Sequence, residues 1–174
     1  RIGLNVDLEG WRPENGKLDK EGELVDDRDY NIKDYDKHLV IDERTQLVAK
    51  KLSEYLKNTD RFAKTIIFCI DIEHAERMAE ALRNENQDLV AKNSKYVMQI
   101  TGENGNRKKE FYPFQKEESK YPVLVTTSKM LTTGVNAPTC KLIVLDTNIN
   151  SLTEFKQIIG RGTRLAPEFG KYYF

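Results

Sequence analysis

The stretch Thr65-Ile66-Ile67-Phe68-Cys69-Ile70-Asp71 decides the fold of this chain. Its apolar residues follow one another without alternating polar positions, which is typical of a strand covered on both faces. Asp71 then supplies an N-cap for a helix with one apolar face. The residues expected on that face are Ala75, Met78, Ala79 and Leu82. A buried strand that runs directly into an amphipathic helix is typical of a parallel α/β fold.

The same alternation of strand and helix continues along the chain. The pattern predicts further strands at residues 96–100, 123–127 and 142–146, and another that begins at 172–174. It predicts helices at residues 42–58, 107–115, 128–132 and 152–161. Strands separated by helices indicate an α/β fold, with a parallel sheet and helices on both faces. Ligands of such sheets bind beyond the carboxyl ends of the strands.

The first 40 residues follow a different pattern. Residues 2–8 alternate apolar and polar side chains, which predicts a half-buried strand. Residues 10–37 are acidic and aperiodic, so we expect a loop or loose hairpin extension with partial disorder. The predicted domains are therefore an N-terminal strand and irregular extension at 1–40 and the main domain at 41–174. Because the chain lacks an initiator Met and stops within a strand-like run, we expect it to be a piece of a larger protein.

Composition limits the classes of partner. Lys and Arg number 28 and Asp and Glu number 28, so the net charge is zero and any nucleic-acid contact must be local. The mean hydropathy is −0.65 and no apolar run approaches the length of a membrane span. The cysteines, Cys69 and Cys140, lie in apolar contexts and form neither a disulfide framework nor a zinc site. We expect a cytoplasmic protein without a metal site in this chain.

The stretch Ser151-Leu152-Thr153-Glu154 reads as a capping box that opens a helix. On that helix Gln157, Arg161 and Arg164 share one face, and we expect Leu152, Phe155 and Ile159, on the other face, to pack against the core. A guanidinium offers a fixed fork of donors to phosphate oxygens and keeps its charge. Two of them beside glycines suit the γ-phosphate of a nucleotide held by a neighbouring domain. The alternative is a solvated basic helix face.

Taken in order, three segments resemble motifs IV, V and VI of superfamily 2 helicases and translocases. They are residues 65–71, residues 123–127 with Leu131-Thr132-Thr133-Gly134-Val135-Asn136-Ala137-Pro138, and residues 154–164. A closer resemblance, carried by residues 59–69, 73–75, 132–146 and 155–165, is to the motor (R) subunit of type I restriction-modification enzymes. The resemblance covers about residues 40–174.

This resemblance implies a fold and an activity that composition alone does not indicate. The chain looks like the second of two RecA-like domains that hold ATP between them. The implied function is ATP-driven translocation of double-stranded DNA, with a separate nuclease domain in the same subunit. The implied partners are the M and S subunits and the first RecA-like domain, which would bind most of the ATP and Mg²⁺.

The family's nucleotide contacts carry over to matching residues. Arg161 and Arg164 match the arginines that approach the γ-phosphate, and Gln157 matches the glutamine that couples the site to the other domain. Gly134 matches the motif V glycine that allows close approach, and Gly160 lies within motif VI. Asn136 departs from the pattern, because relatives usually carry Asp there. Its amide can still bond a ribose hydroxyl but cannot act as a charged acceptor.

The nucleic-acid contacts carry over less completely. Thr126 and Thr127 match the motif V hydroxyls that touch the nucleic-acid backbone, and Asp71 lies where the tracking strand would pass. Arg107 and Lys108 follow closely after Gly102 and form a candidate phosphate patch, with a solvated helix start as the equal alternative. For His74, near a helix start, we expect packing or capping rather than catalysis.

The chain lacks both the phosphate-binding loop and an Asp-Glu-x-His-like box, so we expect no ATP hydrolysis by this chain alone. Three alternatives stay open: another superfamily 2 helicase of repair or remodelling, a catalytically silent interaction module, and a Rossmann-like domain. The last would need a glycine fingerprint, and Gly102-Glu103-Asn104-Gly105 lacks its spacing.

Overall fold

A computed structural model describes residues 12–19, 22–28, 42–101, 107–128, 137–149 and 151–162. The chain divides into two compact units, Arg1–Leu47 and Val48–Phe174, and each is considered by itself. The predicted division at residue 40 stays a prediction, and the strands expected at 2–8 and 172–174 and most of the helix at 128–132 lie outside the described residues. In the described ranges, no helix is both long and apolar enough to cross a membrane.

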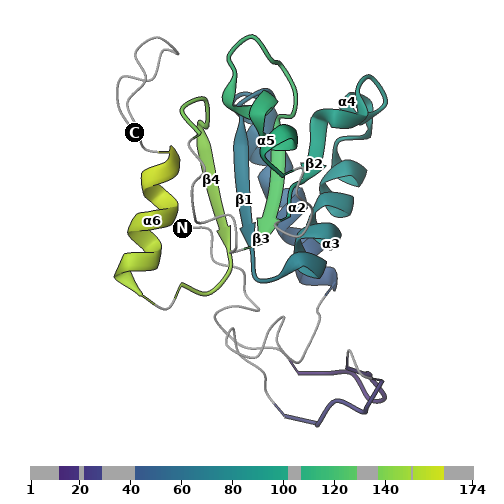
Figure 1. Cartoon of the computed structure of the whole chain (residues 1–174). Helices are drawn as coiled ribbons and strands as arrows, with labels where there is room; N and C mark the ends of the chain where they lie inside the picture. The colour runs from purple at the N-terminus through teal and green to yellow at the C-terminus, as the bar shows by residue number, and fades with distance from the viewer. Residues whose placement is uncertain are drawn as a thin grey trace. The chain divides into compact units, whose positions relative to one another are not determined.

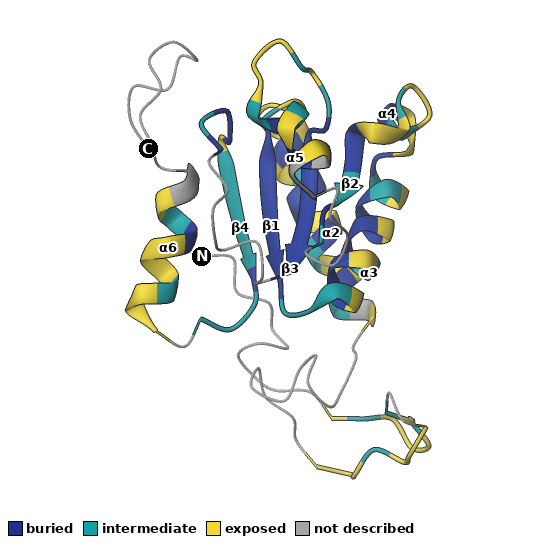
Figure 2. Ribbon diagram, viewed as in Figure 1, coloured by how far each residue is buried: buried dark blue, intermediate teal, exposed yellow. Residues whose placement is uncertain are grey.

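The second unit contains a parallel sheet with the strand order β2-β3-β1-β4 (Figure 1). Its elements, together with helix α2 that leads into it, are α2 (Asp42–Asn58), β1 (Thr65–Cys69), α3 (Ile72–Glu85), α4 (Gln87–Val90), the 3-10 helix η1 (Ser94–Tyr96), β2 (Val97–Gln99), α5 (Arg107–Gln115), β3 (Leu124–Ser128), β4 (Leu142–Asp146) and α6 (Leu152–Gly162). Strand β1 is central and buried at every position, as its continuous apolar run predicts (Figure 2).

Successive side chains of β1 point to opposite faces of the sheet. Helices cover both faces, so β1 contributes to an apolar cluster on each side. Ile67 and Cys69 join an apolar cluster with α2 and α3. Ile66 and Phe68 join a second cluster with α5 and α6. The predicted α/β fold, a RecA-like parallel sheet with helices on both faces, is confirmed.

In the first unit, residues 17–19 pair with residues 22–25 in antiparallel orientation. Leu18 and Leu24 form an antiparallel bridge, and the amide of Val25 donates to the carbonyl of Lys17 at 2.8 Å. Gly22, with φ of 83°, occupies a backbone conformation that side chains disfavour, so the turn needs a glycine there. Part of the predicted extension is therefore held by antiparallel backbone pairing.

Lys64 joins three elements of the second unit. Its side chain is buried, and its ammonium donates to carbonyls at the C-terminus of α5. The acceptors are Pro113, Phe114 and Lys116, at 3.4, 2.9 and 2.6 Å. The carbonyl of Lys64, just before β1, accepts from the amide of Lys141, just before β4, at 2.8 Å. Helix ends leave carbonyls without intrahelical donors, and Lys64 adds a charged donor to those of α5. The Phe114 carbonyl also accepts from the Thr139 hydroxyl, and the Pro113 carbonyl also accepts from the Lys116 amide.

Burial lowers the pKa of the Lys64 ammonium from its usual value, and the nearby Glu118 and Glu117 oppose that shift. In the described part of the chain, carbonyl oxygens and not a paired carboxylate surround this ammonium. A buried cation of this kind depends on its hydrogen bonds, because an unsolvated ammonium without them would be strongly unfavourable.

We predict that Lys64→Met lowers the free energy of unfolding by about 2–4 kcal/mol, because the buried end of α5 loses a charged donor shared by three carbonyls. Denaturant unfolding of the chain measures this change. Lys57→Met is the matched control, since exposed Lys57 also donates to a carbonyl at a helix C-terminus, that of Glu85 at 3.2 Å. The control should change stability by less than about 0.5 kcal/mol; equal losses would contradict the role given to Lys64.

Candidate functional site

The carboxyl edge of the sheet brings together segments that are far apart in the sequence. Cys69 of β1 is level with Ser128 of β3 and with Asp146 of β4 in the sheet register. After β1 the chain continues to Asp71, and after β4 it continues to α6. Parallel sheets bind ligands at this edge, so we treat it as the candidate site.

The turn between β1 and α3 is fixed by side chains from several directions. Asp71 caps α3, because its carboxylate accepts from the amide of His74 at 2.7 Å, and the predicted N-cap is thereby confirmed. On the side of edge strand β2, Gln99 donates from its amide to the carbonyl of Ile72 at 3.0 Å. The amide of Ile70 donates to Nδ1 of His74 at 3.4 Å.

His74 and Asp146 form a buried pair at the same edge. Nε2 of His74 lies 3.2 Å from Oδ2 of Asp146, and the side chains are 0% and 4% exposed. Because Nδ1 accepts the Ile70 amide, a neutral ring carries its proton on Nε2, the nitrogen that lies beside the carboxylate. The expected packing role of His74 is confirmed, but sequence reasoning missed Asp146, since nothing in the local pattern of β4 indicates its partner.

Strand β3 is buried up to its last residue. Thr126 and Thr127 are both 0% exposed, and the hydroxyl of Thr127 donates to the carbonyl of Ser128 at 3.3 Å. Within the described residues, the hydroxyls of Thr126 and Ser128 have no hydrogen-bond partner. Because neither threonine side chain faces solvent, the expected contact with a nucleic-acid backbone gains no support from this arrangement.

Helix α6 begins as predicted, but the side chain that it buries is not one of those expected. The hydroxyl of Ser151 accepts from the amide of Glu154 at 3.1 Å, which confirms the cap. Leu152 and Phe155 are 67% and 41% exposed, whereas Ile158 is fully buried. The expectation that Leu152 and Phe155 pack against the core is therefore wrong. The physical reason is that α6 lies beside an edge strand, β4, whose partly buried surface covers only a narrow line of the helix.

The remaining expected site residues are placed only in part. Gln157 is exposed on α6, and a Cβ at Gly160 would meet no atom within 4 Å, so the space beside that glycine is open. The backbones of Arg107, Lys108 and Arg161 are helical, but their side chains lie outside the described residues. Other expected positions lie entirely outside them: Gly102, Gly134, Asn136 and Arg164.

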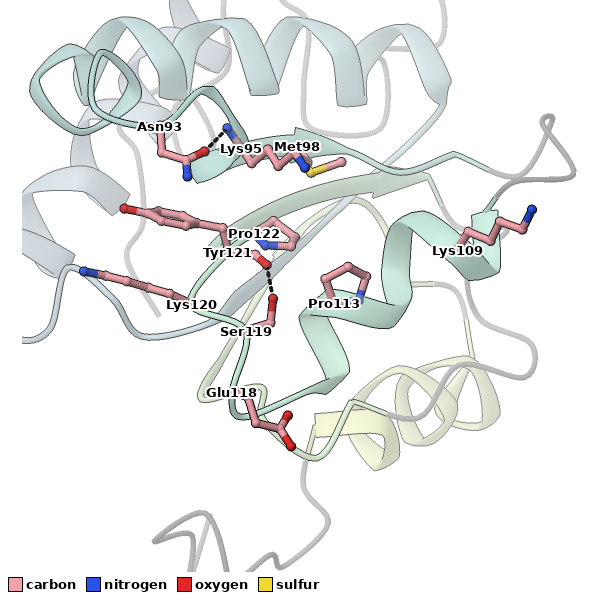
Figure 3. Close-up of a pocket in the computed structure, with 10 residues that line it drawn as sticks. All are labelled: Asn93, Lys95, Met98, Lys109, Pro113, Glu118, Ser119, Lys120, Tyr121 and Pro122. Carbon is pink, nitrogen blue, oxygen red and sulfur yellow. Dashed lines mark hydrogen bonds between the residues drawn. The ribbon is translucent and has the colours of Figure 1, made fainter.

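A separate hollow of about 830 Å³ lies near the amino ends of β2 and β3 (Figure 3). Its lining includes Lys95, Lys120 and Tyr121, which precede these strands, and Pro113 of α5. This is not the edge at which parallel sheets bind ligands, so the hollow does not belong to the candidate site. Over the described stretches of chain, no cluster of three or more His, Cys, Asp or Glu residues could hold a metal ion.

The family model for the helicase conserved C-terminal domain matches residues 24–166. The chain belongs to this family. The match includes the four strands, the candidate edge and all of α6.

Similar proteins indicate the type of helicase. The chain is 55% identical over all of its 174 residues to the type I restriction enzyme EcoAI endonuclease subunit of Escherichia coli, of which it covers 22%. It is 31% identical over 172 residues to the EcoKI endonuclease subunit of Escherichia coli K12, of which it covers 14%. The resemblance to type I restriction motor subunits is thereby confirmed, and the chain spans about a fifth or less of those relatives.

A solved structure agrees with these relatives. The fragment of an HsdR subunit of a type I restriction enzyme from Vibrio vulnificus YJ016 has a TM-score of 0.72 and 52% identity to this chain. That match covers 76% of this chain and 26% of the other. Sequence and structure therefore both support the fold and the family. Neither comparison depends on the roles expected of single residues.

We predict that Ile158→Ala lowers the free energy of unfolding by about 2–4 kcal/mol, because it removes the fully buried side chain by which α6 packs on the sheet. Leu152→Ala, on the same helix but largely exposed, should cost less than about 0.5 kcal/mol. Thermal or denaturant unfolding compares the two variants. A larger loss of unfolding free energy for Leu152→Ala would contradict packing through Ile158 and favour the helix face expected from the sequence.

Proposed function

We propose that this chain is the second motor domain of an ATP-driven translocase of double-stranded DNA, within the R subunit of a type I restriction enzyme. The 55% identity to the EcoAI endonuclease subunit over the whole chain supports this function. The observation that carries the mechanism is the position of α6, which follows the carboxyl end of β4 and holds Gln157 and Arg161 one helical turn apart.

The nucleotide site of this proposal lies between two domains. Arg161 and Arg164 approach the terminal phosphoryl group and stabilise the charge that develops during transfer. The first motor domain supplies the phosphate loop and most contacts to ATP and Mg²⁺, because this chain lacks those motifs. Exposed Gln157 and the open space at Gly160 leave room for that domain to approach α6.

Two further residues complete the proposed nucleotide contacts. Gly134 allows close approach of a neighbouring backbone, since it has no side chain. Asn136 bonds a ribose hydroxyl through its amide, in a neutral contact that is weaker than one made by a carboxylate.

The duplex passes the β1–α3 turn and the start of α5 in this proposal. Asp71, Gly102, Arg107 and Lys108 contact or border the nucleic-acid backbone, and such contacts hold phosphates without reading sequence. Thr126 and Thr127 are buried, so they would reach the backbone only after the end of β3 rearranges. Sequence recognition is left to the S subunit, and the M subunit and a nuclease domain complete the assembly. We place the enzyme in the cytoplasm.

We predict that Arg161→Ala in the complete R subunit, assembled with its partners, lowers the kcat of DNA-stimulated ATP hydrolysis by about 10³-fold. The loss follows from removing a charge that acts only in the transition state. Lys156→Ala removes an exposed cation from the same helix and should leave kcat within about twofold. A catalytically silent interaction module would instead leave the kcat of both variants unchanged.

We also predict that the 174-residue chain alone does not hydrolyse ATP, with or without duplex DNA. The physical reason is the missing phosphate loop and Mg²⁺ box, without which the β- and γ-phosphates are not held. A phosphate-release assay measures the turnover. Turnover by the pure chain would show that it carries a nucleotide site of its own.

A further inference from the structure

The His74–Asp146 pair stands at the junction between the two halves of the proposed machinery. Asp146 is the last residue of β4, and the chain leaves it to form α6, which carries Gln157 and Arg161. His74 lies in the first turn of α3, directly after Asp71, where we place the duplex. The 3.2 Å contact between Nε2 and Oδ2 is thus a direct link between the nucleotide side and the DNA side.

The β1–α3 turn is held from both edges of the sheet. Gln99 of edge strand β2 donates to the carbonyl of Ile72, and Asp146 of edge strand β4 lies in close polar contact with the ring of His74. The central strand β1 lies between them. A displacement at the end of β4 therefore reaches the start of α3 through the close polar contact between Asp146 and His74.

The polar character of the pair has a physical meaning. Burying an imidazole and a carboxylate has a desolvation cost that two apolar side chains would avoid. What the pair adds is a defined orientation of the ring. One ring nitrogen accepts from the amide of Ile70, just after β1, and the other lies 3.2 Å from Oδ2 of Asp146. The ring therefore fixes the relative position of two strand ends along defined axes.

We propose that His74 and Asp146 are positioning residues that couple DNA contact at the β1–α3 turn to nucleotide contact at α6. This inference rests on the proposed translocase function. When duplex DNA moves the turn, the His74 ring carries Asp146 and the segment leading to α6 with it. The pair touches neither ATP nor DNA, so its loss affects the stimulation of ATP hydrolysis by DNA and not the basal rate.

Two substitutions of His74 separate the two ring contacts. His74→Gln carries an amide donor near the position of Nε2, so it keeps the link to Asp146 and loses the acceptor for Ile70. His74→Asn carries an acceptor near the position of Nδ1, so it keeps the Ile70 contact and loses the link to Asp146. Both variants are made in the full R subunit, and ATP hydrolysis is measured with and without duplex DNA.

We expect His74→Gln to retain DNA stimulation within about twofold, and His74→Asn to lose at least about fivefold of it with an unchanged basal rate. The matched control is Ser53→Ala, which removes another buried acceptor: Ser53 Oγ accepts from Asn86, at the opposite end of α3, at 2.8 Å. It should lower the melting temperature without changing the stimulation ratio. If His74→Asn does not fold, Asp146→Asn, which keeps an acceptor oxygen, and Asp146→Ala repeat the comparison.

The outcomes are distinguishable. Stimulation that survives in His74→Asn, that falls equally in both His74 variants, or that falls equally in Ser53→Ala overturns the coupling role. A wild-type subunit that duplex DNA does not stimulate overturns the proposed function itself. Selective loss in His74→Asn, with the melting temperature no lower than that of Ser53→Ala, supports the coupling.

Discussion

Strand β1 hydrogen-bonds to β3 on one side and to β4 on the other, and Cys69 is level with both Ser128 and Asp146. This register brings three strand ends to one edge, although they come from distant parts of the chain. The sheet can be built this way because β1 is apolar at successive positions and helices cover both of its faces. The position of α6 and of the β1–α3 turn follows from that arrangement.

Local patterns predicted much of the fold. The structure has β4 and α5 at the predicted residues, and Asp71 and Ser151 cap the predicted helices. Such features are predictable because apolar runs and caps depend only on residues that are neighbours in the sequence. Strand β2 is shorter than expected, since the residues before it, through Tyr96, form a 3-10 turn. The buried face of α6 was predicted incorrectly, because periodicity does not reveal that a helix will lie beside an edge strand.

The site was less predictable than the fold. The family resemblance led to α6 and its arginines, and the comparisons confirm the family while the roles of single residues stay proposals. The pairing of His74 with Asp146 depends on the sheet order, which no local spacing encodes. Burial of Thr126 and Thr127 follows from the central place of β3 between β2 and β1, which is likewise a property of the assembled sheet.

The sequestered amine of Lys64 has a consequence for chemical labelling. Amine-reactive reagents attack the neutral, accessible form of a lysine, and this one is 8% exposed, with its donors engaged by the carbonyls of α5. Acetylation there requires the end of α5 to detach first. The rate at which a reagent modifies Lys64, relative to exposed Lys57, is therefore a built-in reporter of local opening in the domain.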